Sequence, residues 1–276
     1  MGSILAAVLI ITALGFLFGY GLALAAKKLE VVRDERVAEI GAILPGINCG
    51  ACGYPGCFGY AEAVVRKEAG VDRCSPGGAA AASGLGRIMG VGVTVSEPRV
   101  ARVHCGGGDD TTQHKYRYNG LADCRSAAAL AGGFLVCSEG CLGLGSCVRV
   151  CNFDAINIDG SGRLRINEEK CTACGLCVQA CPKRLIELIN KKKRTHVVCR
   201  SYERGQVCNK ICKVSCIACT RCVKACKQNA IHIENNLAVI DYAACTSCGE
   251  CAAVCARKCI AHYPSAANST AGSAQT

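Results

Sequence analysis

Two cysteine runs, CIACTRCVKAC at 216–226 and CTSCGECAAVC at 245–255, decide how this chain folds. Each run has the spacing C-x2-C-x2-C-x3-C, which places four thiols in eleven residues. Thiols this close cannot all form disulfides with distant partners without strain, whereas the same spacing suits the ligation of iron–sulfur clusters. Because 26 of the 276 residues are cysteine, we expect a reducing compartment in which thiols stay free.

Structural zinc is the alternative for cysteine-rich runs. Closed zinc sites usually combine two C-x2-C pairs about 12–20 residues apart, and three x2-spaced thiols followed by a distant fourth fit that pattern poorly. The chain also has no Trp and only 5 % aromatic residues, so it lacks the large side chains that normally fill a core. Bound clusters would supply folding energy in their place.

The two runs together resemble the two-cluster bacterial ferredoxins. In that family, three close cysteines and a fourth from the other run bind each cluster. The spacing agrees, because a short loop can wrap three corners of a cubane and only a distant residue can reach the fourth. Lys227 and Ala256 stand where the family has a proline. The resemblance implies [4Fe–4S] ligand sets of Cys216, Cys219, Cys222 and Cys255 (site 4), and Cys226, Cys245, Cys248 and Cys251 (site 5).

An earlier stretch of the chain repeats this unit. Nine cysteines recur in register, five at an offset of 75 and four at an offset of 74. The residues between these cysteines are also similar, because CVRVCNFDAINID (147–159) aligns with CVKACKQNAIHIE (222–234). The duplication predicts a second ferredoxin-like domain with its own pair of clusters.

The earlier unit lacks one ligand, because Leu144 stands where the later unit has Cys219. Cys137 is the nearest remaining cysteine and is our candidate for the missing ligand. Its counterpart Cys212 is then a spare thiol or an alternative ligand. The predicted sets are Cys137, Cys141, Cys147 and Cys181 (site 2), and Cys151, Cys171, Cys174 and Cys177 (site 3).

Several cysteines fall outside these sets, and a buried free thiol that packs as a small apolar side chain is the default interpretation for each. Cys124, Cys199 and Cys212 nevertheless keep their places in the duplication. We therefore leave open a sixth cluster, or alternative ligation, that uses them. Cys105 and Cys208 receive no predicted role, and Cys259 is interpreted as a non-ligand.

The N-terminal stretch from Ser3 to Ala26 contains 24 residues without a charge. As a helix it would be about 36 Å long, enough to cross a hydrocarbon core of about 30 Å. Lys27 and Lys28 follow directly, and the positive-inside tendency places the rest of the chain in the cytoplasm. A cleaved signal peptide is disfavoured, since no positive region precedes the long apolar run. We predict a single-pass anchor in the cytoplasmic membrane.

A third motif, NCGACGYPGC at 48–57, follows the apolar stretch. Its glycines let the backbone bend tightly and approach the sulfurs. Helices are expected over 30–43, 60–68 and 79–91, from their periodicity and good helix formers. Together with a cysteine further on, the motif supplies four thiols for one cluster, namely Cys49, Cys52, Cys57 and Cys74 (site 1).

An apolar helix, this motif, a YAEAV helix, a fourth cysteine and ferredoxin domains together resemble the B subunits of Rnf electron-transport complexes. The segments HKYRYNGLADCRSAAALAGG (114–133) and GCLGLGSC (140–147) resemble the longer anaerobe-type members, and the resemblance covers residues 1–263. It implies a membrane subunit that takes electrons from soluble ferredoxin. Other membrane and NADH-side subunits would then reduce NAD and pump Na⁺ or H⁺. The motif at 48–57 is less specific alone, because a corrinoid protein of acetyl-CoA metabolism has a similar domain.

Other functions remain as alternatives to this interpretation. They are an Rsx-type reducer of a redox-sensing regulator, a polyferredoxin component of another membrane oxidoreductase, and a scaffold with purely structural clusters. The sequence has no G-x-G-x-x-G or Walker A motif, so we expect one component of a translocase without a complete active site. The formal charge of +11 does not predict nucleic-acid binding, because five [4Fe–4S] clusters would add about −10.

A basic run joins the two ferredoxin-like domains. It is either a solvated linker or a docking patch for an acidic partner such as ferredoxin, whose approach it would steer. The run consists of Lys191, Lys192, Lys193 and Arg194.

We expect an α+β protein with one transmembrane helix, a small helical Fe–S domain and two tandem two-cluster ferredoxin-like domains. The predicted segments are a transmembrane anchor (1–28), an N-terminal 4Fe–4S domain (29–91), a connector (92–133), ferredoxin-like domain 1 (134–190), a basic linker (191–211), ferredoxin-like domain 2 (212–263) and a disordered tail (264–276).

Overall fold

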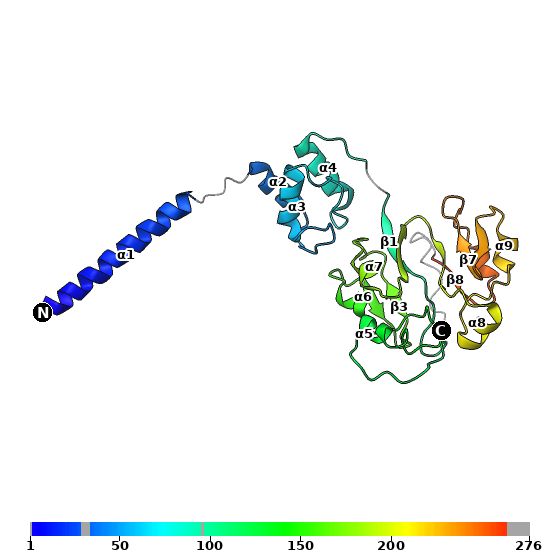
Figure 1. Ribbon diagram of the computed structural model, residues 1–276. Helices are drawn as coiled ribbons and strands as arrows, with labels where there is room; N and C mark the ends of the chain where they lie inside the picture. The colour runs from blue at the N-terminus through cyan, green and yellow to red at the C-terminus, as the bar shows by residue number, and fades with distance from the viewer. Residues whose placement is uncertain (1, 29–33, 95–96, 264–276) are drawn as a thin grey trace.

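The computed structural model describes residues 2–28, 34–94 and 97–263, so the predicted tail at 264–276 lies outside the described residues. Three parts follow one another along the chain: a long helix, a small helical domain and a larger body of helices and short strands (Figure 1). The described residues thus contain both helices and strands, as the sequence predicts.

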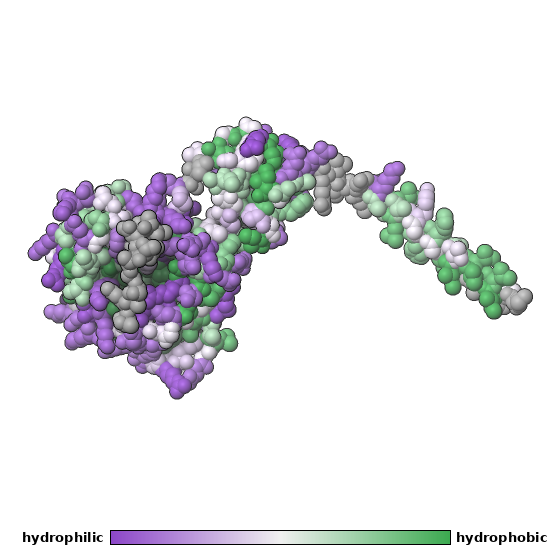
Figure 2. Space-filling view, turned by 180° about the vertical axis from the view of Figure 1, so that it is seen from behind, coloured by the Kyte–Doolittle hydropathy of each residue, from purple (hydrophilic) through white to green (hydrophobic). Residues whose placement is uncertain are grey.

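The first part is helix α1 (Gly2–Lys28), which lies apart from the other two in both views (Figures 1 and 2). Within it, Ile4–Lys28 is the one stretch of the described chain that is long and apolar enough to cross a membrane. Its apolar residues stand out against the hydrophilic surface of much of the larger body (Figure 2). A helix that is apolar all round and packed against nothing in its own chain suits a lipid environment.

The helical domain contains α2 (Glu35–Ile43), α3 (Gly56–Val65) and α4 (Gly78–Met89). Helix α2 begins after Asp34, whose side chain accepts a hydrogen bond from the backbone N–H of Arg36 as an N-cap. The three predicted helices are confirmed, although the start of the first prediction lies outside the described residues. The helices pack around a core of Val37, Ile40, Leu44, Tyr60, Ala61, Val64 and Leu85.

The larger body contains two units with the same order of strands. We name residues 99–190 the first unit and residues 195–263 the second unit. The first unit contains β1 (Arg99–Val103), α5 (Cys124–Ala129), α6 (Ser146–Arg149), β2 (Ile156–Ile158), β3 (Leu164–Ile166), α7 (Leu176–Ala180) and β4 (Ile186–Asn190). The second unit contains β5 (Thr195–Val197), α8 (Gly205–Ile211), α9 (Arg221–Ala225), β6 (Ile231–Glu234), β7 (Leu237–Ile240), α10 (Glu250–Ala253) and β8 (Ile260–His262).

Each unit has two antiparallel strand pairs. In the first unit β1 pairs with β4 and β2 with β3; in the second, β5 pairs with β8 and β6 with β7. The register places Ala101 opposite Leu188, and His196 opposite Ala261. The first strand of each unit therefore closes onto its last strand, which brings the two ends of the unit together.

These first strands fall in segments that we predicted to be connections. Strand β1 lies in the predicted connector at 92–133, and β5 lies in the predicted linker at 191–211. Both are too short to show a clear alternation of apolar and polar residues, which is why sequence pattern alone did not place them. The structure assigns β1 to the first unit and β5 to the second, so the turn between the units is only Lys191–Arg194.

Buried thiols contribute to the core of each unit. The core of the first unit includes Cys147 and Cys177 beside aliphatic residues from β1 to β4. The core of the second unit includes Cys199, Cys216 and Cys222 beside aliphatic residues from β5 to β8. Cysteines thus occupy interior positions that large aromatic side chains fill in other proteins.

Candidate iron–sulfur sites

Site 1 lies between α2 and α4 in the helical domain. Cys49 and Cys52 lie in the loop before α3, Cys57 lies in the first turn of α3, and Cys74 precedes α4. Burial raises the pKa of Cys74, and the charges that thiolates at Cys57, Cys52 and Cys49 would carry raise it further. The structure therefore brings together all four cysteines predicted for this site.

Tight backbone turns hold the site 1 loop. Gly50, Gly53 and Gly56 have φ angles of +70°, +90° and +81°, which side-chain-bearing residues rarely adopt. The N–H of Cys57 donates to Oδ1 of Asn48 at 2.8 Å, and a Cβ on Gly56 would lie only 2.8 Å from that same oxygen. The glycines thus allow the loop to close around the thiols.

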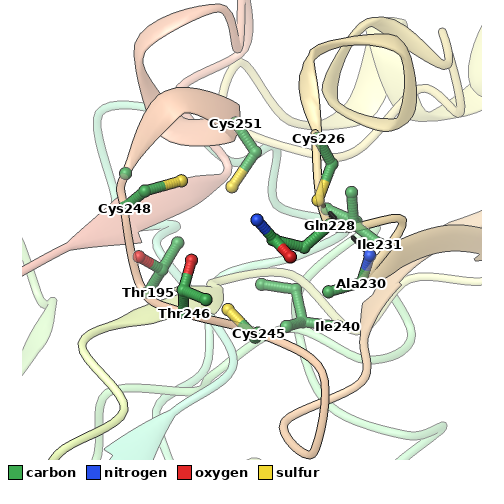
Figure 3. Close-up of a pocket in the computed structure, with 11 residues that line it drawn as sticks. Thr195, Cys226, Gln228, Ala230, Ile231, Ile240, Cys245, Thr246, Cys248 and Cys251 are labelled. Carbon is green, nitrogen blue, oxygen red and sulfur yellow. Dashed lines mark hydrogen bonds between the residues drawn. The ribbon is translucent and has the colours of Figure 1, made fainter.

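Sites 3 and 5 occupy equivalent hollows in the two units. The hollow of site 3 is lined by all four predicted cysteines, which are Cys151, Cys171, Cys174 and Cys177. The hollow of site 5 is likewise lined by Cys226, Cys245, Cys248 and Cys251. In Figure 3 these four thiols surround a common space, with the Gln228 side chain between them. Apolar side chains such as Ile231 and Ile240 complete the wall of this hollow.

Site 2 differs from our prediction at one position. Its hollow is lined by Cys124, Cys141, Cys147 and Cys181, whereas Cys137 is absent from the lining. Burial raises the pKa of Cys147 to about 11, and Cys124 and Cys181 are the thiols whose charge contributes next. Cys124 therefore lies where we expected Cys137 from the sequence.

A hydrogen-bonded cap explains why Cys124 reaches site 2. Asp123 caps α5 by accepting from the N–H of Ser126, and its other oxygen accepts from Oγ of Ser146 at 2.8 Å. The N–H of Cys124 donates to the same Ser146 Oγ at 2.8 Å. Because Ser146 directly precedes Cys147, these bonds hold Cys124 beside it. The duplication hid this role, since at its offset of 75 Cys124 aligns with Cys199.

Site 4 has a fifth thiol beside the predicted four. Cys259, interpreted from sequence as a non-ligand, lies 3.5 Å from Cys255 between the two sulfur atoms. Hydrogen bonding from Cys259 lowers the pKa of Cys255 to about 5 and that of Cys216 to about 6. Burial raises the pKa of Cys222 to about 11, and the charges of Cys216 and Cys219 contribute to it. The four predicted ligands are therefore neighbours, and Cys259 contacts two of them.

The spacing of the thiols fits clusters better than single ions. In the described parts of the chain, no three His, Cys, Asp or Glu side chains converge closely enough to hold one metal ion. With Zn–S bonds of about 2.3 Å, a zinc ion would draw its sulfurs to about 4 Å from one another. A cubane holds its ligands at four separate corners, and so the wider arrangement around each hollow suits [4Fe–4S].

The basic run between the units makes contacts within the chain. Lys191 donates from Nζ to the carbonyl of Glu168, and Lys193 donates from Nζ to the carbonyl of Cys245 at 2.7 Å. The N–H of Arg194 donates to Oγ of Ser247. Lys192 instead forms an exposed ion pair with Glu97 at 2.8 Å. These contacts favour a role in joining the units over a free docking patch.

Comparisons with known proteins agree with this chemistry. Residues 44–76 match a family model for an Fe-S cluster domain, and residues 135–190 match the 4Fe-4S dicluster domain. The chain is 44 % identical over 260 residues to the B subunit of the Na(+)-translocating ferredoxin:NAD(+) oxidoreductase complex of Acetobacterium woodii, an alignment that covers 94 % of this chain and 78 % of that one.

Two further relatives extend the match. The chain is 37 % identical to the B subunit of the ion-translocating oxidoreductase complex of Methanosarcina acetivorans, over 91 % of this chain and 95 % of the relative. It is 38 % identical to the B subunit of the proton-translocating ferredoxin:NAD(+) oxidoreductase complex of Clostridium ljungdahlii, over 94 % of this chain and 91 % of that one. The chain belongs to the family of B subunits of Rnf-type ion-translocating oxidoreductase complexes.

Proposed function

We propose that this chain is a membrane-anchored electron-transfer subunit of an Rnf-type complex. It accepts electrons from reduced ferredoxin and relays them to other subunits, which reduce NAD and transport Na⁺ or H⁺. The observation that carries the proposal is the presence of equivalent four-thiol hollows in two successive units of one chain. The relatives' names support it, because two of them refer to a ferredoxin:NAD(+) oxidoreductase complex.

The two units act as tandem ferredoxin-like domains in this proposal, and the helical domain adds a further cluster. The proposed ligand sets are Cys49, Cys52, Cys57 and Cys74 (site 1); Cys124, Cys141, Cys147 and Cys181 (site 2); Cys151, Cys171, Cys174 and Cys177 (site 3); Cys216, Cys219, Cys222 and Cys255 (site 4); and Cys226, Cys245, Cys248 and Cys251 (site 5).

Backbone N–H groups prepare these thiols to carry negative charge. The N–H of Leu185 donates to Sγ of Cys181 at 3.4 Å, and that of Ala230 donates to Sγ of Cys226 at 3.3 Å. Such donors stabilise the more negative, reduced state of a thiolate-bound cluster. When bound, each [4Fe–4S] cluster would supply a one-electron redox centre. The chain's part is to bury that centre and set its potential.

Neighbouring sites lie close enough to influence one another. Burial raises the pKa of Cys174 in site 3, and the charge of Cys49 in site 1 adds to that rise. Cys147 of site 2 contributes to the raised pKa of Cys177 in site 3, and Cys222 of site 4 to that of Cys251 in site 5. Electrons could therefore pass between sites 1, 3 and 2, and between sites 4 and 5.

The membrane arrangement follows from α1. We propose that α1 crosses the cytoplasmic membrane once, with Lys27 and Lys28 at the cytoplasmic end, in accordance with the positive-inside tendency. The span carries no ionisable side chain before Lys27 other than the phenol of Tyr20. An ion path across the membrane normally needs charged groups, so other subunits supply it.

An exposed part of site 4 offers a docking surface for ferredoxin. Cys219 is exposed, and the neighbouring Arg221 and Lys224 on α9 are exposed cations. This surface would steer an acidic partner to a thiol ligand at the protein surface. It is a better candidate than the basic run at 191–194, whose donors are mostly engaged within the chain.

Stopped-flow reduction by photoreduced ferredoxin tests the function and the docking surface together. We expect rapid bleaching of cluster absorbance in the purified chain, slowed about tenfold by Arg221→Glu with Lys224→Glu at low salt and much less at high salt. Lys192→Glu is the matched control, because it reverses one exposed cation at the basic run. Clusters that dithionite reduces but ferredoxin does not would contradict the proposed function.

A further inference from the structure

A buried arginine lies at the boundary between the two units, outside sites 1 to 5. Arg102 of β1 has only 2 % of its surface exposed. Side chains alternate between the two faces of a strand, and Ala101 lines the hollow of site 3. Arg102 therefore points away from that hollow. Arginine carries a permanent positive charge and is almost never fully buried unless it is paired, so the contacts of this side chain decide what it does.

Two side chains of the second unit pack against Arg102. Its Cζ lies 4.3 Å from the centroid of the Tyr263 ring, which is a cation–π contact. The ring of His196 on β5 stacks on the same tyrosine, with the two centroids 4.8 Å apart and the planes 9° from parallel. Tyr263 directly follows β8, the strand that pairs with β5. The arginine of the first unit is thus held by the paired outer strands of the second.

Within the first unit, Arg102 is connected to site 3. Its Nη1 donates to Oε1 of Glu168 at 2.6 Å, and Glu168 precedes the proposed ligand Cys171 by three residues. The N–H of Ala101 donates to Sγ of Cys171 at 3.5 Å. Both the backbone of β1 and the ion pair therefore link Arg102 to the same ligand of site 3.

The same cluster of side chains approaches site 5. Thr195, which directly precedes His196, lines the hollow of site 5 (Figure 3). Burial raises the pKa of Tyr242, a charge at Cys245 adds to the rise, and the charge of Arg102 opposes it. Tyr242 is thus close both to Arg102 and to Cys245, a proposed ligand of site 5. Arg102 therefore lies between sites 3 and 5.

The positive charge of Arg102 is only partly compensated. Nε and Nη2 of Arg102 and both ring nitrogens of His196 are buried, and none of them has a hydrogen-bond partner among the described residues. Burial lowers the pKa of His196 to about 3, and the charge of Arg102 contributes to this, so the ring is neutral at pH 7. Buried polar atoms without partners are costly, and a redox role is one reason for which native proteins keep them.

We propose that the buried positive charge of Arg102 raises the reduction potentials of the clusters at sites 3 and 5, on the two sides of the unit boundary. This inference rests on the proposed electron-transfer function. Reduction adds one negative charge to a cluster, and a nearby cation favours that state. Salt screens this attraction little, because the cation is buried.

This effect would draw electrons in either unit toward the boundary between them. There, one electron leaves the reduced cluster of one unit and reduces the cluster of the other, and no bond forms or breaks. Arg102 takes no electron itself. Its part is to make the two clusters that face the boundary easier to reduce.

Redox titration of the anaerobically purified full-length chain, monitored by EPR with dithionite as reductant, tests the proposal. We expect Arg102→Met to make reduction at sites 3 and 5 about tenfold less favourable, which corresponds to about 59 mV for one electron. Arg102→Lys keeps the charge and should restore most of the potential. Cys174→Ser and Cys248→Ser identify the two signals, because a serine oxygen ligand alters the spectrum of its own cluster.

Arg99→Met is the matched control, because it removes an exposed cation from the same strand. Its effect on the potentials should be small and should disappear at high salt, whereas the effect of Arg102→Met should persist. Unchanged potentials in Arg102→Met would overturn the proposal. An equal loss in Arg102→Lys would do the same, because it would show that packing and not charge sets the potentials.

Glu168→Gln keeps the test decisive where Arg102→Met does not fold. It removes the negative partner of Arg102, so we expect the opposite change, with reduction at site 3 becoming more favourable. A lowered or unchanged potential in this variant would contradict the proposal. These titrations use no ferredoxin, so a failure of electron uptake from ferredoxin would count against the proposed function and leave the role of Arg102 standing.

Discussion

The two α+β units share strands, helices and cluster spacing, yet they surround their equivalent sites 2 and 4 with different residues. The first unit has Leu144 and Leu185 where the second has Cys219 and Cys259. The first unit is thus one thiol short in its own repeat, and Cys124 from the segment before it lines the hollow of site 2. The second unit has all four predicted thiols of site 4 and, in addition, the thiol of Cys259. A duplicated sequence therefore preserved the scaffold while the chemistry at one of its two sites diverged.

Removing the recruited ligand should have the largest effect. In Cys124→Ala, site 2 keeps only three thiolates, so we expect the cluster to be lost or degraded to a three-iron form. Adding Leu144→Cys should restore it, because that change recreates the spacing of the second unit. Iron content and EPR of the anaerobic protein measure both outcomes.

A variant in the second unit tests the same comparison between sites 2 and 4. Cys219→Ala should damage site 4 as Cys124→Ala damages site 2, although Cys259 could replace the lost ligand because its thiol already contacts Cys216 and Cys255. An intact cluster in Cys124→Ala, together with loss of the site 2 signal in Cys137→Ala, would favour the ligand set predicted from the sequence.

The next effect concerns thiol reactivity in the metal-free protein. Hydrogen bonding from Cys259 lowers the pKa of Cys255 to about 5, whereas burial raises that of Cys141 to about 12. At pH 7 the first is therefore a thiolate and the second a thiol. Only thiolates react, so iodoacetamide should label Cys255 at least about 100-fold faster. Mass spectrometry of time points gives both rates.

The pH dependence of labelling should also differ between these two thiols. Above pH 6 the rate at Cys255 should stay flat, because its pKa already lies below that range. The rate at Cys141 should rise about tenfold per pH unit up to about pH 11, since its raised pKa keeps the thiol protonated until then. Equal rates with a common midpoint near 9 would indicate that the metal-free protein lacks these environments.

A smaller effect is expected on redox potential. Cys259 donates toward ligands of site 4, and a donor to ligand sulfur stabilises the reduced cluster. Cys259→Leu should therefore lower the midpoint potential of that cluster by about 40 mV, which corresponds to about 1 kcal/mol for one electron. Leu185→Cys should raise the potential of site 2. EPR-monitored redox titration measures both midpoint potentials. An unchanged potential in both variants would show that a thiol at this position does not tune the cluster.

The sequence predicted more of the scaffold than of the individual ligands. Cysteine spacing grouped the thiols of sites 1, 3 and 5 as the structure does, because their ligands come from short loops and one crossing residue. It could not place Cys124, which reaches its site through a hydrogen-bonded cap formed by Asp123 and Ser146. The pairing of β1 and β5 was not predicted for a similar reason, since each pairs with the last strand of its unit, which is a long-range contact.

The smallest expected effect concerns the turn that joins the two units. Lys192 and Glu97 form an exposed pair, with 71 % and 58 % of their side chains accessible, so Lys192→Ala should change the free energy of unfolding by less than about 0.5 kcal/mol. Lys193 instead donates to the carbonyl of Cys245, so Lys193→Ala should cost about 1 kcal/mol and loosen site 5. Thermal unfolding of the protein with its clusters bound compares the stability of the two variants. A larger cost for Lys192→Ala would assign the joining role to the exposed lysine, because a solvated ion pair alone cannot supply it.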